Sequence, residues 1–242
     1  MKKVTKAIAA IMLMTAAVFA AGCTKEEPSS GSHNGHAYVD LGLPSGTQWA
    51  TSNLEAGNSK GHAHFAWGET MPMSYTSVGQ EVIANYKFWG TDGKMSKYCS
   101  TDHLTVLDDD DDAATVHWGE GWRIPTIEEW KELFDNCTYT YIEPDKNSKS
   151  RREGALFTAP NGNTLFLPVA VNYETYITVE EEDYAGCSYW SSSVTVKGDH
   201  DNWVDAQFAQ VFSWGKGTTI SNKYRWVGLE IRPVLDGSFS KK

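Results

Sequence analysis

Long apolar runs are scarce in this sequence. The longest, Ala7–Ala21, follows the basic residues Lys2 and Lys3 and is too short to span a bilayer comfortably. It ends in small residues, which is typical of a secretory signal peptide and not of a transmembrane helix. We therefore expect residues 1–22 to be a signal peptide and the remainder to be exported.

Cysteine is also scarce, with four residues in 242. Cys23 directly follows the apolar run and is considered below. Cys99, Cys137 and Cys187 permit at most one disulfide, in any of three pairings. Their spacing matches neither a zinc site nor a CxxC redox motif, so buried, unpaired thiols are the simpler interpretation.

Positive charge is in deficit. Removal of residues 1–22 leaves 18 basic against 31 acidic residues, a net charge of −13. Such an acidic chain has no electrostatic footprint for nucleic acid or for anionic lipid. The roughly 205 residues beyond the N-terminal segment suit one domain with a sizeable core.

Catalytic and metal-binding motifs are missing as well. The sequence contains no GxSxG elbow, no HExxH and no Gly-rich phosphate loop, so we expect neither an enzyme nor a bound cofactor. The aspartate run Asp108–Asp112 invites a calcium interpretation, but Ala113 and Gly119 stand where an EF-hand loop needs Gly and Glu. His62 and His64 have metal-pair spacing without a convincing third ligand. We expect no metal site.

What is present is clearest between residues 108 and 137. Asp108–Asp112 is placed to begin a short helix that ends at Trp118, with Gly119 as its C-terminal breaker. Trp122–Ile124 precedes a proline and is expected to be extended. This stretch is an architectural unit without features of an active site.

A second helix is expected directly afterwards. Thr126 and Glu129 have capping-box spacing. The helix should bury one apolar face and expose a polar one. The apolar face is expected to comprise Ile127, Trp130, Leu133 and Phe134.

The chain beyond Cys137 is expected to be mostly β. Two apolar runs around Asn161-Gly162-Asn163 predict a hairpin. Further strands are expected over 188–196, 203–212 and 227–234. The polar segments between them are expected to be loops, where binding residues usually lie; they are 173–186, 197–202 and 213–225.

Six motifs in order carry a family resemblance: YVDLGLPSGTQWATSN, FAWGET, DDAATVHWGEGWRIPTIEEWKEL, NGNTLFLPVA, YWSSS and GLEIRPV. Together they resemble the Fibrobacter succinogenes major paralogous domain of Bacteroidetes lipoproteins, across roughly residues 38–234. That family is similar to the C-type lectin-like fold, shared with formylglycine-generating enzymes and retroelement variable proteins. The resemblance implies an α+β class, with two short helices flanking a mixed, mostly antiparallel sheet that carries long loops.

The resemblance also sets the domain organisation. Residues 37–236 would form the C-type lectin-like domain and 237–242 a C-terminal tail. AAGC, ending at Cys23, resembles a bacterial lipobox, which implies lipidation of Cys23 and a flexible tether over residues 23–36. Thr24-Lys25-Glu26-Glu27 resembles a surface-export signal. We therefore expect a lipid-anchored protein of the outer membrane, exposed on the cell surface.

The sequence lacks some motifs of these related proteins, so not all of their binding and catalytic residues can be expected here. The Glu-Pro-Asn and Trp-Asn-Asp motifs of calcium-dependent lectins are missing, although Asp199, Asp201, Asn202 and Asp205 supply oxygen ligands. Formylglycine-generating enzymes use a pair of nearby cysteines, and Cys187 stands alone.

Ten tryptophans serve either the core or a ligand surface. Six lie inside the shared motifs and are assigned to the core: Trp49, Trp67, Trp118, Trp122, Trp130 and Trp190. The expected ligand contacts are Trp203, Trp214, Tyr224 and Trp226. Arg123 and Arg232 are expected to pair with Glu129, Glu230 or backbone carbonyls.

The predicted function is a binding or adhesion module whose C-terminal loops recognise a glycan or a protein. The alternative is a structural subunit of a cell-surface assembly without a soluble ligand. An enzyme of the formylglycine-generating type is the least favoured hypothesis.

Overall fold

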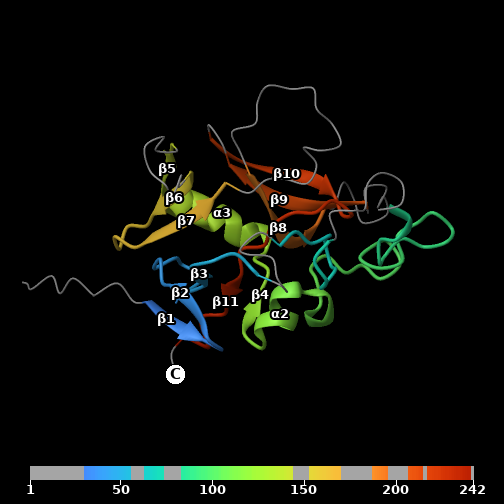
Figure 1. Cartoon of the computed structure of the whole chain (residues 1–242), viewed down its shortest axis with the longest axis horizontal. Coiled ribbons are helices and arrows are strands. Elements are labelled where there is room, and N and C mark those ends of the chain that lie inside the picture. The colour runs from blue at the N-terminus through green and yellow to red at the C-terminus, as the bar shows by residue number, and fades with distance from the viewer. Residues whose placement is uncertain are drawn as a thin grey trace, which may run out of the picture.

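The computed structural model describes residues 30–55, 63–73, 83–143, 153–169, 187–195, 207–214 and 217–240. Within them, three sheets that are antiparallel throughout their named strands accompany two α-helices (Figure 1). The class is thus α+β with mostly β structure, as expected. The predictions for Cys23, His62, Trp203 and residues 173–186 and 196–206 fall outside the described residues.

A five-stranded sheet joins segments from both ends of the described chain. Its order is β1 (Ser30–His33), β2 (His36–Val39), β3 (Gln48–Ala50), β11 (Val234–Leu235) and β4 (Trp122–Arg123). The short β11 lies between β3 and β4, because Val234 pairs with both Trp49 and Arg123. Residues near the C-terminal end thereby hold the N-terminal strands to the helical unit.

The helical unit forms as the sequence predicts. After a 3₁₀ turn over Asp109–Asp111, α2 spans Ala113–Trp118, capped by the side chain of Asp112 and ended by Gly119 at φ +86°. A right-handed helix cannot continue through a positive φ, and glycine adopts this conformation without strain, so the helix ends there. Next, α3 spans Ile127–Asn136 behind the complete Thr126–Glu129 capping box.

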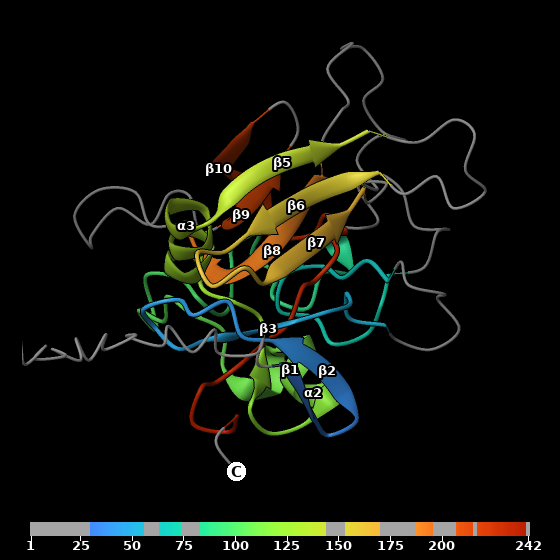
Figure 2. The ribbon, with the colours of Figure 1, turned by 90° about the vertical axis from the view of Figure 1, so that its left-hand side faces the viewer.

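Two three-stranded sheets follow. One comprises β5 (Thr138–Ile142), β6 (Gly154–Thr158) and β7 (Thr164–Pro168), and β6 and β7 form the predicted hairpin. The other comprises β8 (Cys187–Val194), β9 (Phe208–Trp214) and β10 (Thr218–Tyr224). Figure 2 shows β5–β7 lying across the β8–β10 sheet, with α3 beside them.

Trp130 on α3 links these layers. Its ring stacks on Phe212 of β9, with centroids 4.6 Å apart and planes 2° apart, and contacts Trp49 of β3 at 4.7 Å. Its Nε1 donates to the carbonyl of Trp190 at 3.3 Å. One helix face therefore fixes the five-stranded sheet against the β8–β10 sheet.

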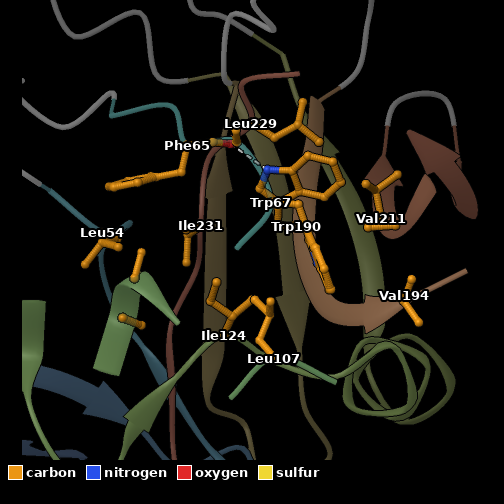
Figure 3. Packing of buried hydrophobic residues seen from close by; sticks show 14 of the residues in the cluster. Leu54, Phe65, Trp67, Leu107, Ile124, Trp190, Val194, Val211, Leu229 and Ile231 are labelled. Carbon is orange, nitrogen blue, oxygen red and sulfur yellow. Dashed lines mark hydrogen bonds between the residues drawn. The ribbon is translucent and has the colours of Figure 1, made fainter. Parts of the chain in front are cut away.

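The core is rich in tryptophan, and all six tryptophans assigned to it are buried. Around Trp190, side chains from segments far apart in the sequence converge, among them Phe65, Trp67 and Ile231 (Figure 3). Trp190 donates from Nε1 to the carbonyl of Phe65 at 2.7 Å, so burial leaves this indole N–H satisfied (Figure 3).

Arg123 and Arg232 both make the structural contacts that were expected of them. Arg123 forms a two-pronged ion pair with Glu129, at 2.5 and 2.6 Å. Arg232 is 1% exposed and donates to Asn53 Oδ1 and to the carbonyls of Ala50 and Phe166.

Several expectations were wrong. Phe134 is 46% exposed, whereas Ile127, Trp130 and Leu133 of the same helix are buried. Residues 218–224 form β10 and pair with β9, so most of the segment that was expected to be a long loop over 213–225 is strand. Residues 227–233 make isolated bridges at Leu229 and Glu230, and regular pairing is limited to β11.

The cysteine expectation holds where the structure describes it. Cys99 and Cys137 are buried free thiols. Every pairing among Cys99, Cys137 and Cys187 includes one of these two, so none of the three disulfides considered is present. Burial raises the pKa of the Cys137 thiol to about 11, which keeps it protonated and unreactive at neutral pH.

Candidate functional site

An aromatic surface lies where β9 begins and β10 ends. It consists of Phe208, Tyr224, Trp226 and Trp89. The ring centroids of Phe208 and Tyr224 are 4.3 Å apart, and those of Tyr224 and Trp226 are 4.6 Å apart with planes only 16° apart. Trp89 meets Trp226 edge-on at 5.7 Å. Tyr224 is 42% exposed, while the other three are partly buried.

Strand register explains this arrangement. Phe208 is the direct cross-strand partner of Tyr224, and paired residues point to the same side of a sheet. Phe212 and Trp214 share that side because side chains alternate along β9. The end of the sheet face that carries Phe212 and Trp214 is covered, because Trp130 packs on Phe212 and Tyr141 contacts Trp214. The aromatic surface is the end of this sheet face that Trp130 and Tyr141 do not cover.

Arg225 fixes this surface to the rest of the molecule. Its side chain is 0% exposed and lies over the ring of Trp67 at 4.7 Å. Its terminal nitrogens donate to the carbonyls of Lys97 and Tyr98, at 3.1 and 2.6 Å. Burial lowers the pKa of Arg225 to about 10, which still leaves it charged at neutral pH. The cation therefore anchors the end of β10 to the segment that also carries Trp89.

The four expected contact residues fare differently. Tyr224 and Trp226 lie together on the aromatic surface. Trp214 is 2% exposed in the core, so its expected role as an exposed platform is wrong. Its ring points to the covered end of the sheet face, where Tyr141 contacts it. Trp203 lies outside the described residues.

Sequence reasoning missed Phe208 and Arg225. For Phe208, the alternating pattern predicts a place in a strand but no role in binding. Its pairing with Tyr224 could have been found if residues 208–224 had been interpreted as a hairpin. No local signal marks Arg225 as buried, because its partners lie more than a hundred residues away.

Two carboxylates of the aspartate run, Asp111 and Asp112, make hydrogen bonds within the fold. Asp111 accepts hydrogen bonds from Lys87, from Lys97 at 2.6 Å and from the Tyr98 hydroxyl at 2.6 Å. Burial alone would raise the pKa of Asp111, but these partners outweigh it and lower the pKa. Two lysines therefore already neutralise this carboxylate.

The neighbouring Asp112 caps α2 and also ties it to the strand that follows. Its Oδ1 accepts from the amides of Ala114 and Thr115, and its Oδ2 accepts from that of Ile124 at 2.7 Å. Burial raises its pKa to about 6 against these hydrogen bonds. Across the described part of the chain, no three His, Cys, Asp or Glu side chains are grouped to hold a metal ion.

Comparisons with known proteins supply no identification: no family model, curated protein or solved structure matches this chain. Among the described residues, no helix is both long and apolar enough to cross a membrane.

Proposed function

We propose that this protein is an anchored binding module of C-type lectin-like architecture, belonging to the Fibrobacter succinogenes major paralogous family. Its ligand surface would be formed by Tyr224 and Trp226, with Phe208 and Trp89 beside them. The observation that carries this proposal is the stack of Phe208, Tyr224 and Trp226 at the uncovered end of the sheet face. Clustered, partly exposed aromatic side chains are typical of sugar-binding and protein-binding surfaces.

Rigidity supports the same proposal. Arg225 holds the end of β10 to the carbonyls of Lys97 and Tyr98, so the aromatic side chains are positioned before any ligand arrives. A preorganised surface loses little conformational entropy on binding.

The placement of the N-terminal strand fits an anchored module. β1 begins at Ser30, seven residues after Cys23. It lies at the bottom of both views, whereas β10 lies at the top (Figures 1 and 2). A diacylated Cys23 would therefore hold the molecule near β1, away from β10.

The anchor is tested separately from the ligand. Mass spectrometry of the mature protein should find a diacylglyceryl group on Cys23, and Cys23→Ser should release the protein from membranes. Digestion by protease added to intact cells would place the domain on the outer surface. Full protection until the outer membrane is permeabilised would place it in the periplasm.

The ligand test is a glycan array probed with the chain from Thr24 to Lys242, with calcium and with chelator. The informative variant is Trp226→Ala, and Phe134→Ala is the matched control because Phe134 is exposed on α3, outside this surface. Binding kept with chelator and in the control, but lost in Trp226→Ala, is the expected result. Silence across the array would overturn the glycan interpretation.

A structural subunit of a surface assembly is the second candidate, and one observation favours it. Tyr224 stacks against both Phe208 and Trp226, so its ring faces are occupied and its edge is what remains exposed. Occupied ring faces cannot stack on a sugar, whereas aromatic residues are enriched in contacts between protein chains. Glycan silence together with a stable native assembly that Trp226→Ala dissociates would select this function.

A further inference from the structure

A groove of about 830 Å³ lies beside the five-stranded sheet and shares no residue with the aromatic surface. We call it the polar groove. Its volume falls in the range of small-ligand sites. Its lining includes Gly46, Thr47, Arg123, Glu129, Asp236 and Gly237.

Two turns that line the polar groove meet at their backbones. The first is closed by a hydrogen bond from the amide of Gly46 to the carbonyl of Leu43, at 2.9 Å. The second is closed by a hydrogen bond from the amide of Phe239 to the carbonyl of Asp236, at 3.0 Å. A Cβ on Gly237 would clash with the carbonyl oxygen of Gly46, so glycine is needed for this close approach. This part of the groove is therefore formed by backbone held in two fixed turns.

Arg123 brings hydrogen-bond donors to the polar groove. A guanidinium has five N–H groups, and Glu129 accepts from two of those of Arg123, at 2.5 and 2.6 Å. The Arg123 side chain is 34% exposed, and it has no other hydrogen-bond acceptor in the described part of the chain. The ion pair with Glu129 thus balances the charge of Arg123 but leaves three of its N–H groups for a ligand.

Asp236 brings a hydrogen-bond acceptor to the same groove. The residue is exposed, and Ser238 alone among the described residues donates to its carboxylate, with the Ser238 amide 2.8 Å from Oδ1. A carboxylate can accept about four hydrogen bonds, so acceptor capacity remains. The hydrogen bonds from Ser238 lower the pKa of Asp236, and the positive charge of Arg123 lowers it further. Asp236 is therefore ionised at neutral pH.

The sheet register places Arg123 and Asp236 near one another. Arg123 pairs with Val234 of β11. The amide of Asp236 donates to the carbonyl of Gly121 at 3.1 Å, so the pairing continues past the end of β11. Asp236 is thus a diagonal neighbour of Arg123 on the same side of the sheet, which corresponds to Cα atoms about 7–8 Å apart. A ligand in the groove can therefore reach a donor and an acceptor at once.

From this arrangement we infer that the polar groove is a second ligand site, which takes an uncharged sugar through two adjacent hydroxyl groups. A hydroxyl group both donates and accepts, so one can accept from Arg123 while its neighbour donates to Asp236. An anion would be repelled by Asp236, and an ammonium group offers no acceptor to the N–H groups of Arg123. A metal ion fits no better, because the described ranges group no three metal-ligating side chains.

The test is NMR titration of the ¹⁵N-labelled chain from Thr24, which contains every described element. The probes are the methyl pyranosides of glucose, galactose and mannose, which differ in the configuration of their hydroxyl groups. The per-O-methylated form of each sugar is its control, because it keeps the ring and the oxygen acceptors but has no O–H donor. We expect at least one free sugar to shift the amides of Gly46 and Gly237 saturably, while its methylated form does not.

Variants of Asp236 test the proposed contact. Asp236→Ala should weaken this binding about tenfold, because it removes a charged hydrogen-bond acceptor. Asp236→Asn keeps one acceptor oxygen and should weaken it less. Asp92→Ala is the matched control and should leave the binding unchanged. Asp92 is exposed in a turn outside the groove, and its Oδ1 likewise accepts from an amide two residues further on, that of Lys94 at 3.1 Å.

Three results would overturn the proposal: equal shifts by free and methylated sugars, no saturable shift with any of the sugars, or equal weakening by Asp236→Ala and Asp92→Ala. An amide spectrum of Asp236→Ala that matches the wild type away from the groove shows that the variant is folded. Trp226→Ala should not alter the titration, so failure of this site and failure of the aromatic surface can be distinguished.

Discussion

Tyr224 and Trp226 stack on one another at the surface, with ring centroids 4.6 Å apart, although Arg225 between them is wholly buried. Side chains alternate along an extended chain, so the arginine points inward while both neighbours stay on the outer side. The inward residue is the anchor, and the outward residues are the proposed contacts. Stability and binding should therefore be coupled at this position.

Arg225→Met should destabilise the protein by about 3 kcal/mol, because the carbonyls of Lys97 and Tyr98 would lose their buried donors. Backbone amides of residues 86–98 should exchange hydrogen faster, as measured by mass spectrometry. Lys131→Met is the matched control, since Lys131 is a half-exposed cation that pairs with Glu128 on the same helix. Unchanged exchange over 86–98 in the Arg225 variant would show that this arginine is no anchor.

Trp214 and Tyr224 should respond differently to truncation, although both belong to the same hairpin. Trp214→Ala empties a buried site and should cost about 3–5 kcal/mol of unfolding free energy. Tyr224→Ala removes a partly exposed cross-strand contact and should cost about 1 kcal/mol. Urea denaturation measures both. Similar losses for the two variants would mean that the aromatic surface is part of the core.

The most predictable part of the molecule is the segment from Asp108 to Leu133. Its signals are local: an acidic cap, a helix-ending glycine, a residue before proline and a capping box whose two residues are three positions apart. Each acts within one turn of its own position, so a single sequence suffices to interpret it. The ion pair between Arg123 and Glu129 was predictable for the same reason.

The hairpin around Trp214 was less predictable because distant residues decide it. Thr218–Tyr224 is a polar segment that becomes a strand by pairing with β9. Trp214 is buried beside Tyr141, and Phe212 beneath Trp130, which are contacts across some 70 to 80 positions. Such tertiary packing overrides the local polarity that suggested an exposed loop.

Calcium should not stabilise this protein through its aspartate run. Lys87 and Lys97 already neutralise Asp111, so a calcium ion would have to displace both ammonium groups. The melting temperature should therefore be the same with calcium and with chelator, as measured by scanning calorimetry. A rise with calcium that persists in an Asp199→Asn, Asp201→Asn double variant would contradict this account of Asp111.

Glu129 should make part of the stability dependent on acid pH. Burial alone would raise its pKa, but the hydrogen bonds and charge of Arg123 outweigh this and lower it below the unfolded-state value. A carboxylate with a lowered folded-state pKa stabilises above its unfolded pKa, about 4.3, and loses that contribution as pH falls through the folded value. Glu129→Gln should thus cost roughly 2 kcal/mol at pH 7.

The difference in unfolding free energy between wild type and Glu129→Gln should shrink steadily as the pH falls below about 4.3, because protonation then removes the same charge from the wild type. Urea denaturation between pH 3 and pH 7 measures it. Glu128→Gln is the matched control, since Glu128 precedes it on α3 and is exposed. A difference that stays constant with pH would show that the ion pair with Arg123 contributes nothing. The lost stability would then come from the capping box and the Thr47 contact, which a neutral side chain also disturbs.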